Sequence, residues 1–254
     1  GYVYSRENDW ESHTLELGGS RDFLQHNLTV GLGATLVFND IWRSGDNNFR
    51  RNMNVYGAAL TVAGTPSRRD VVSLTYSLSY LSGYQASPYR YVLLFDDLGF
   101  RQAVPEHVPD GRQRHALAAR WKRHLFRDSA VHAHLRGYVD DWQVASITLG
   151  GEYLIQVSEF VISPHLRGYA QKHAGFYQAQ YTHLVNFMTF DRELSSFVDA
   201  FVGIRATWSR AHLGPLDELR VEAKVDGFGF YFFDFPRLQS RYGLTAELAL
   251  GVSL

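Results

Sequence analysis

Residues 131–140 read VHAHLRGYVD, and they decide the fold class. Apolar or small side chains occupy the odd positions from Val131 to Val139, while polar side chains occupy the even positions from His132 to Asp140. Successive side chains of a β-strand point to opposite faces of its sheet, so this period of two predicts a strand with one apolar and one polar face. The spacing of an amphipathic helix fits the segment poorly.

The same alternation recurs along nearly the whole chain. Apolar residues alternate with polar or charged ones in 28–39, 72–80, 160–171, 198–208 and 219–227. These patterns predict an all-β protein that forms one domain over residues 1–254, with about twelve antiparallel strands. The predicted strands span residues 2–8, 10–23, 28–39, 51–63, 70–82, 112–125, 130–141, 144–156, 160–171, 194–208, 219–232 and 240–254.

The connections between these strands have two lengths. Short polar turns are predicted near 25–27, 65–69, 126–129, 158–159 and 211–218, and long excursions over 83–111 and 172–193. Short connections at one end and long ones at the other are typical of up-and-down barrels of bacterial outer membranes. The sequence therefore predicts a transmembrane antiparallel up-and-down β-barrel with short periplasmic turns, long extracellular loops and both termini on the periplasmic side.

Composition limits the alternatives. The 254 residues carry 25 basic and 26 acidic side chains, so the net charge of −1 gives no field that favours nucleic acid. Cysteine is absent, which excludes disulfides, zinc–thiolate sites and cysteine nucleophiles. No apolar run approaches the roughly 20 residues of a membrane-spanning helix, yet 15% of residues are aromatic. Such a chain is either soluble or crosses lipid as a closed β-barrel.

A soluble all-β sandwich also alternates, but with its apolar face inside. The predicted strands are long, about twelve residues each, and their polar faces carry many full charges, which favours the membrane barrel. In such a barrel, Leu135 and Leu166 face acyl chains while Arg136 and Arg167 face an enclosed lumen. Aromatic residues suited to an interfacial girdle lie towards strand ends at Trp10, Tyr80, Trp121, Tyr153, Trp208, Tyr231 and Tyr242.

Several spaced motifs in the middle of the chain resemble those of a known family. They are SPYRYV at 87–92, PDGRQRH at 109–115, RGYVDDW at 136–142, RGYAQ at 167–171 and FY at 176–177. The chain resembles the uncharacterised bacterial proteins of domain-of-unknown-function family thirty-five seventy, closely over 80–180 and more loosely over 1–254. The resemblance implies an outer-membrane barrel and carries no established activity.

The polar faces of the central strands line the lumen of such a barrel. The turn near 126–129 places Arg114 opposite Asp140 or Asp141. Two interpretations stay open for this group: a constriction whose Arg side chains bind carboxylate, phosphate or sugar groups, or a salt-bridge network that closes and stiffens the lumen. The predicted lumen residues are Arg112, Arg114, Arg136, Tyr138, Asp140, Asp141, Arg167, Tyr169 and Gln171.

The long loops are rich in aromatic residues. Apolar loop segments of this size rarely stay bare in water, so we expect them either to plug the barrel or to dock on a partner protein. The residues expected to do so are Tyr89, Arg90, Tyr91, Leu94, Phe95, Phe100, Phe176 and Tyr177.

Other chemistry is not expected. His132, His134 and His165 face the lumen, but spacing alone fixes neither a distance nor a third ligand, so no metal is predicted. No nucleophile-elbow or metalloprotease motif is present, and neither an enzyme nor a cofactor is predicted.

Two functional hypotheses follow for a protein embedded in outer-membrane lipid. The first is a transport or export barrel whose Arg and Asp side chains act on an unidentified small-molecule or polymer cargo. The second is a non-conducting scaffold that holds envelope proteins through its aromatic loops.

Overall fold

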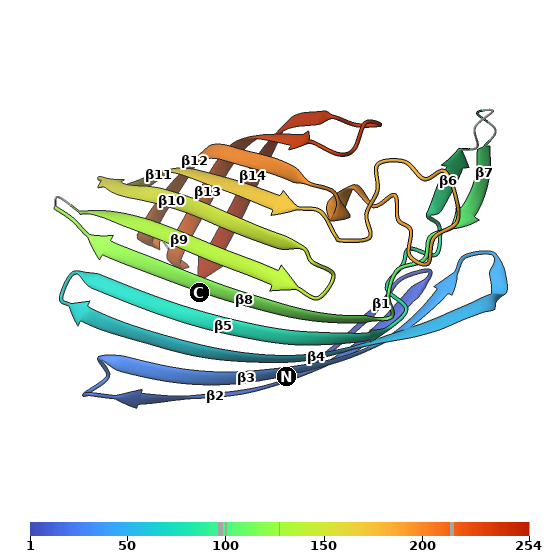
Figure 1. The fold of residues 1–254 in the computed structure, drawn as a ribbon. Helices are drawn as coiled ribbons and strands as arrows, with labels where there is room; N and C mark the ends of the chain where they lie inside the picture. The colour runs from blue at the N-terminus through green and yellow to red at the C-terminus, as the bar shows by residue number, and fades with distance from the viewer. Residues whose placement is uncertain (96–98, 100, 127, 214–215, 254) are drawn as a thin grey trace.

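The main body of the protein is a single antiparallel β-sheet. A computed structural model describes residues 1–95, 99, 101–126, 128–213 and 216–253. Twelve strands pair in the order β1-β2-β3-β4-β5-β8-β9-β10-β11-β12-β13-β14 (Figure 1), which confirms the predicted strand number and up-and-down order. Their bounds are β1 Tyr2–Arg6, β2 Trp10–Phe23, β3 Leu28–Arg43, β4 Asp46–Ser67, β5 Asp70–Gly83, β8 Gly111–His124, β9 Ser129–Asp140, β10 Ala145–Val157, β11 Phe160–Lys172, β12 Phe197–Leu213, β13 Leu216–Phe232 and β14 Ser240–Ser253.

Two further strands lie inside the first long loop. Strands β6 (Tyr91–Phe95) and β7 (Arg101–Pro105) form a separate two-stranded sheet, and the second long loop contains the 3-10 turn η1 (Arg192–Leu194). Both loops gather beyond one end of the main sheet, while short turns join the strands at the opposite end (Figure 1). Across the described part of the chain, no helix is long and apolar enough to cross a membrane.

Strands β3 and β4 are longer than their alternation predicts. Their ladder continues past the predicted ends to the pairs Ile41↔Arg51 and Trp42↔Arg50, so the hairpin extends beyond its neighbours (Figure 1). At about 3.4 Å per residue, the 22 residues of β4 measure about 75 Å. The long hairpin reaches the first long loop, because Arg43 Nε donates a hydrogen bond to the Pro88 carbonyl at 2.9 Å.

The register divides the sheet into an apolar and a polar face. Leu135 lies opposite Ala119 and Leu149, whereas Arg136 lies opposite Ala118 and Thr148. Apolar side chains are open, with Leu166 58% and Leu248 79% exposed, while Asp199 and Asp226 on the polar face are 7% and 6% exposed. Side chains converge on the concave side of a curved sheet and spread on its convex side, so the polar face is concave. The predicted separation of an apolar from a polar face is confirmed.

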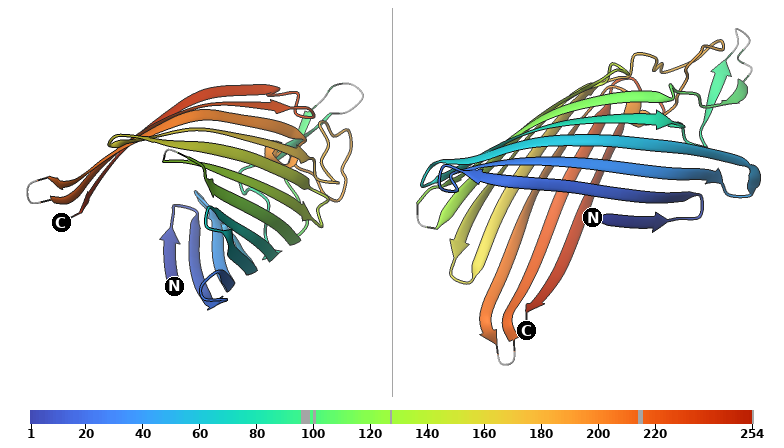
Figure 2. Two further views of the ribbon diagram at one scale, coloured as in Figure 1. Left: turned by 90° about the vertical axis from the view of Figure 1, so that its left-hand side faces the viewer. Right: turned by 90° about the horizontal axis from the view of Figure 1, so that it is seen from below.

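The prediction of a closed barrel is not met, because the sheet is open. Strands β1 and β14 are not paired, and the two edges lie apart (Figure 2). The edges are unequal: β1 has five residues and pairs only with Glu11–Leu15 of β2, whereas β14 has 14 residues. The edge that β1 presents is therefore much shorter than the edge that β14 presents.

Candidate functional site

The concave face brings side chains from β8 to β14 into rows across the strands. One row runs through Arg136, Thr148, Tyr169, Asp199 and Phe230, which are successive partners in the antiparallel register. Because directly opposed residues of neighbouring strands approach within about 5 Å, each row acts as one continuous surface. A depression of about 670 Å³ lies on this face and is lined by charges of both signs.

Asp226 is the most buried acid that lines this depression. Its Oδ1 lies 2.6 Å from His165 Nε2, and its Oδ2 accepts a hydrogen bond from Lys224 Nζ at 2.6 Å. His165 is on β11 and Asp226 on β13, so their contact crosses β12 at Gly203. An added Cβ at Gly203 would collide with the Asp226 carboxylate, so the glycine allows the two strands to share this contact.

Arg205 forms a second bridge across the strands. It pairs with Glu152 of β10, and its Nη1 lies 4.0 Å from Glu222 of β13. His132 Nδ1 lies 3.2 Å from the same Glu152 carboxylate. Among the described residues, no group of three or more His, Asp or Glu side chains is arranged to hold a metal ion. These charges therefore form an extended salt-bridge network along the concave wall.

The predicted constriction residues form two separate groups, and the first surrounds Asp140. This carboxylate is fully buried and accepts hydrogen bonds from Arg112 Nε at 2.8 Å, Arg112 Nη2 at 2.5 Å and the Tyr138 hydroxyl at 2.6 Å. The Val144 N–H donates to its other oxygen at 2.9 Å, and the Arg112 guanidinium lies 4.2 Å from the Trp142 ring centre. Both oxygens are engaged within the protein, so this geometry fits the salt-bridge interpretation better than a ligand-binding fork.

Not all members of the predicted group join this network. Arg114 lies opposite Asp140 in the register, as predicted, yet Arg112 makes the ion pair. A residue two positions along the neighbouring strand is a diagonal contact within reach of a long side chain. Arg114 Nε is buried without a hydrogen-bond partner among the described residues, Arg136 is exposed on the concave face, and Asp141 is exposed in the turn. The predicted placement of Arg114 opposite Asp140 is therefore confirmed, while the ion pair to Asp140 is made by Arg112.

The second group lies on β11. The Tyr169 hydroxyl donates to Gln171 Oε1 at 2.5 Å, and Gln171 Nε2 donates to two carbonyls of the loop before β12, at 2.7 and 3.0 Å. Arg167 lies 3.6 Å from Asp199, whose side chain is 4% exposed and whose Oδ1 has no hydrogen-bond partner among the described residues. Gln171 therefore fastens the loop to the rim of the sheet, while Arg167 stays on the concave wall.

A row of phenyl rings on the concave face was missed at the level of sequence. Neighbouring ring centres lie 5.3 to 6.3 Å apart. The rings belong to Phe197 and Phe201 of β12 and to Phe228, Phe230 and Phe232 of β13, and we call them the phenyl ladder. The signal was available, because the three β13 rings continue the same even-numbered set as the charged residues of 220–226.

Most of the buried apolar side chains lie outside the main sheet. Segments 84–95, 101–110, 141–144, 173–196 and 233–239 gather beyond the strand ends, and we call them the loop cap (Figure 1). One buried cluster consists of Val108, Trp142, Val144, Ala174, Tyr177 and Leu194. The second consists of Val92, Leu94, Tyr181, Met188 and Phe190. The loops therefore have the apolar core that the sheet lacks.

A buried carboxylate joins the two long loops. The Glu106 side chain is 1% exposed and accepts hydrogen bonds from the Ser87 N–H at 3.0 Å, from Arg90 Nη1 at 3.2 Å and from the Thr189 hydroxyl. Arg90 also reaches Asp191 at 2.8 Å. Burial opposes the charge of Arg90, but Asp191 and Glu106 outweigh it and raise its pKa. The ion network therefore fixes one loop against the other.

The predicted loop residues divide by exposure. Those buried or partly buried in the loop cap are Leu94, Phe95, Phe176 and Tyr177. Burial raises the pKa of Tyr177 to about 12, so its hydroxyl stays a hydrogen-bond donor at neutral pH. Tyr89 and Tyr91 are 47% and 46% exposed, and Phe100 lies outside the described residues. The aromatic loops thus pack mainly on one another beyond the strand ends.

We expect Arg90→Gln to loosen the loop cap. The substitution leaves the Glu106 carboxylate buried without its cationic partner, which costs about 2 kcal/mol. That loss corresponds to about a 30-fold larger population of molecules in which the loop cap is open. Limited proteolysis in 173–196 measures this opening, and Arg68→Gln in the turn at the opposite end serves as the control. Equal cleavage rates in the two variants would show that the ion network does not hold the cap.

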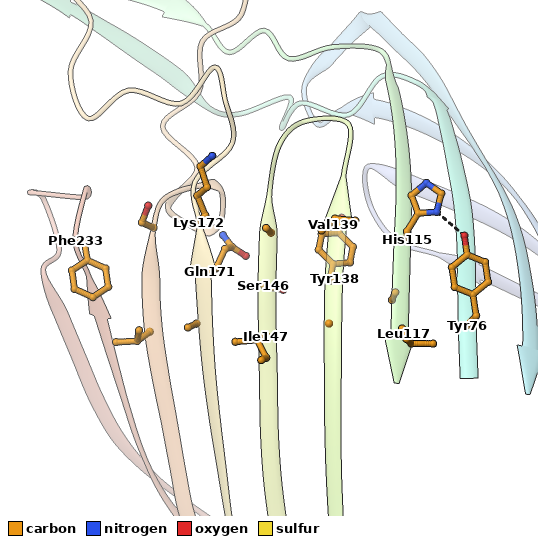
Figure 3. Close-up of a pocket in the computed structure, with 16 residues that line it drawn as sticks. Tyr76, His115, Leu117, Tyr138, Val139, Ser146, Ile147, Gln171, Lys172 and Phe233 are labelled. Atoms are coloured by element: carbon orange, nitrogen blue, oxygen red, sulfur yellow. Dashed lines mark hydrogen bonds between the residues drawn. The ribbon is translucent and has the colours of Figure 1, made fainter. Parts of the chain in front are cut away.

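The convex face has a shallow apolar depression of about 790 Å³ near the loop-cap end (Figure 3). Leu117, Val139 and Ile147 line it. At its edge the Tyr76 hydroxyl lies 2.7 Å from His115 Nδ1, the hydrogen bond drawn in Figure 3. Apolar side chains next to a polar Tyr–His pair are the arrangement expected where hydrocarbon gives way to the interfacial region of a membrane.

Comparisons with known proteins identify a family but no activity. No curated protein matches the chain. Among solved structures, BamA from Haemophilus ducreyi lacking POTRA domains 1-3 is similar at a TM-score of 0.46 and 10% identity, over 99% of this chain and 60% of that one. The siderophore receptor PiuA from Acinetobacter baumannii is similar at a TM-score of 0.41 and 10% identity, over 98% of this chain and 47% of that one. The family model described as "Protein of unknown function (DUF3570)" matches residues 51–212, which include the motifs quoted above, and the chain belongs to this family.

Proposed function

We propose that the sheet spans the bacterial outer membrane as a closed barrel and that its polar interior is a path for ions and small solutes. The separation of the two faces carries this proposal. Leu166 and Val202 on the convex face are 58% and 66% exposed, whereas neighbouring Arg167 and Arg205 make ion pairs on the concave face. Apolar surface in water costs about 25 cal/mol per Å², and acyl chains remove that cost.

A sheet that lies in hydrocarbon must also close into a barrel. Unpaired backbone N–H and C=O groups at a sheet edge are not tolerated in hydrocarbon, so β1 and β14 need partners there. With twelve strands in alternating directions, β1 and β14 run antiparallel and are able to pair with each other. Pairing of these two edges converts the open sheet into the barrel that the proposal requires.

The concave face favours anions as the conducted species. Asp140, Glu152 and Asp226 are each matched by at least one basic group. Several basic side chains of this face have no carboxylate within ion-pair distance among the described residues. They are Arg114, Arg120, Lys122, Arg136 and Arg241. The wall therefore has an excess of unpaired positive charge.

We expect the purified protein to conduct ions in a planar bilayer with a preference for anions. One charge about 8 Å from the path through water contributes about 0.5 kcal/mol, or about a twofold change in permeability ratio. Arg136→Ser and Arg241→Ser should each lower the anion preference by about that factor, while Arg68→Ser outside the lumen should not. The reversal potential under a KCl gradient measures the ratio. Absence of any conductance would contradict the channel.

A scaffold role is the second candidate. Tyr89 and Tyr91 are 47% and 46% exposed on the loop cap, so they offer contacts to an envelope protein. In that case Tyr89→Ser/Tyr91→Ser should lose a protein that co-purifies with the unaltered chain, with conductance unchanged. Co-purification that is independent of these tyrosines would contradict this role.

A further inference from the structure

The phenyl ladder differs from the rest of the concave face. On these two adjacent strands, the five rings surround a single polar side chain, that of Asp199, which lies between Phe197 and Phe201 and opposite Phe230. Phe201 lies directly opposite Phe228, and Phe197 opposite Phe232, so the ladder runs from the middle of the sheet towards the loop cap. Asp199 is 7% exposed, so the surface that the ladder presents is mainly apolar.

Packing accounts for only one end of the strip. Phe197 and Phe232 are 9% and 4% exposed, and Phe232 lies 6.2 Å from Phe235 of the loop cap. Phe201, Phe228 and Phe230 lie further from the cap and are only partly buried. The rings of the ladder cover one another, but their outer faces stay open to the concave side. Contact with the loop cap therefore explains the burial of Phe197 and Phe232. It does not explain why Phe201, Phe228 and Phe230 stand on this face.

The rings of Phe228 and Phe201 are held in place by the sheet and by each other. The ring of Phe228 rests on Gly243 of β14, where an added Cβ would collide with it. Its ring centre is 5.5 Å from that of Phe201, at an interplanar angle of 29°. Because a glycine accommodates the ring and a second ring stacks on it, the apolar surface is fixed before any ligand arrives, which lowers the entropy cost of binding.

Cationic side chains border the strip. Arg241 lies opposite Phe230 in the register, and its guanidinium is 5.9 Å from the Phe228 ring centre. Arg136 is in the same row as Phe230, four strands away. Arg167, 5.1 Å from the Phe201 ring centre, faces Asp199, which offsets its charge. Arg241 and Arg136 have no such carboxylate among the described residues, so they remain available to an anion.

We propose that the phenyl ladder and Arg241 form a binding site for organic anions that have an apolar body and one carboxylate or sulfonate group. The apolar body covers the open faces of Phe201, Phe228 and Phe230 and removes them from water. The anionic group pairs with a guanidinium that lacks an internal partner. The site rests on the proposed function, because it requires the concave face to enclose a water-filled path.

Phenylbutyrate and octanoate are suitable probes, since they share the anionic group but have an aryl and an alkyl body. Calorimetric titration of the full chain in lipid nanodiscs, corrected with empty nanodiscs, should show saturable binding. Phenylbutyramide, which lacks the charge, should bind about tenfold more weakly. If octanoate binds as tightly as phenylbutyrate, the site accepts apolar bodies in general. If phenylbutyrate binds more tightly, the site prefers aromatic bodies.

Variants locate the binding on the ladder. Phe230→Ser and Arg241→Gln should each weaken phenylbutyrate binding about tenfold, whereas Phe230→Leu, which keeps an apolar surface, should change it by about twofold at most. Phe126→Ser removes a phenyl ring that is 68% exposed in the turn before β9, and it should leave binding unchanged. Circular dichroism of each variant confirms that the sheet has formed.

Two results would overturn the site: no binding above empty nanodiscs, or equal affinity in Phe230→Ser, Arg241→Gln and the unaltered chain. Chloride conductance separates this failure from failure of the channel. A chain that conducts chloride without binding phenylbutyrate refutes the site alone. A chain that binds phenylbutyrate through Phe230 and Arg241 but carries no current retains the site and refutes conduction.

Discussion

In lipid vesicles, Arg136→Cys should react with a charged, membrane-impermeant maleimide about 100-fold faster than Leu135→Cys. The two positions are consecutive on β9, point to opposite faces and are both exposed in the structure. Bringing a charged reagent into hydrocarbon costs about 2.5–3.5 kcal/mol, which corresponds to about a 100-fold lower rate at the lipid-facing thiol. The chain has no cysteine of its own, so each variant reports a single site.

Unfolding in detergent provides the control for this pair. Both thiols should then react at the same rate, since neither is shielded by lipid or by the sheet. If Leu135→Cys reacted as fast as Arg136→Cys in vesicles, the convex face would be open to water. The membrane-spanning proposal would then be wrong, whatever the conductance of the preparation.

The second large effect is expected at Asp140. Asp140→Ala leaves the Arg112 guanidinium, 11% exposed, without its partner, and it removes the acceptor for Tyr138 and Val144. Breaking a buried ion pair by removing one partner costs about 3–5 kcal/mol. Chemical unfolding in lipid vesicles, followed by circular dichroism, measures the loss of stability.

The neighbouring Asp141 offers a matched control. Its side chain is exposed, so Asp141→Ala should change the free energy of unfolding by about 0.5 kcal/mol at most. The double variant Arg112→Met/Asp140→Leu removes both charges and should recover most of the stability lost in Asp140→Ala. Similar stability of Asp140→Ala and Asp141→Ala would show that the pair does not hold the β9–β10 turn.

Local alternation was sufficient to predict the sheet but not its edges. Segment 131–140 has one apolar and one polar set, and the structure places them on the convex and concave faces of β9. The end of β3 was placed too early and the start of β4 too late, because past Phe38 the ladder continues through residues that no longer alternate between polar and apolar. Closure depends on β1 and β14 meeting, and no pattern within either strand specifies its partner.

The sequence analysis named residues of the candidate site but did not predict which of them contact one another. The register placed Arg114 opposite Asp140, but side-chain reach lets the diagonal Arg112 take the carboxylate. The phenyl ladder was missed because its rings are apolar members of alternate sets that are otherwise mainly polar, so residue type alone does not mark them as concave. The β6–β7 hairpin and the buried Glu106 depend on two loops that meet only after folding, so neither loop sequence reveals them alone.

The location of the apolar core has a consequence for folding. The cluster around Trp142 joins Val108, which lies two strands earlier in the chain, to Ala174 and Leu194, which lie two strands later. Contacts of such long sequence separation form only after the intervening strands have been ordered, because the entropy of the long intervening chain must be lost first. Under the membrane-spanning proposal, the sheet is then the lipid-dependent step of assembly, and the loop cap is the water-dependent step that follows it.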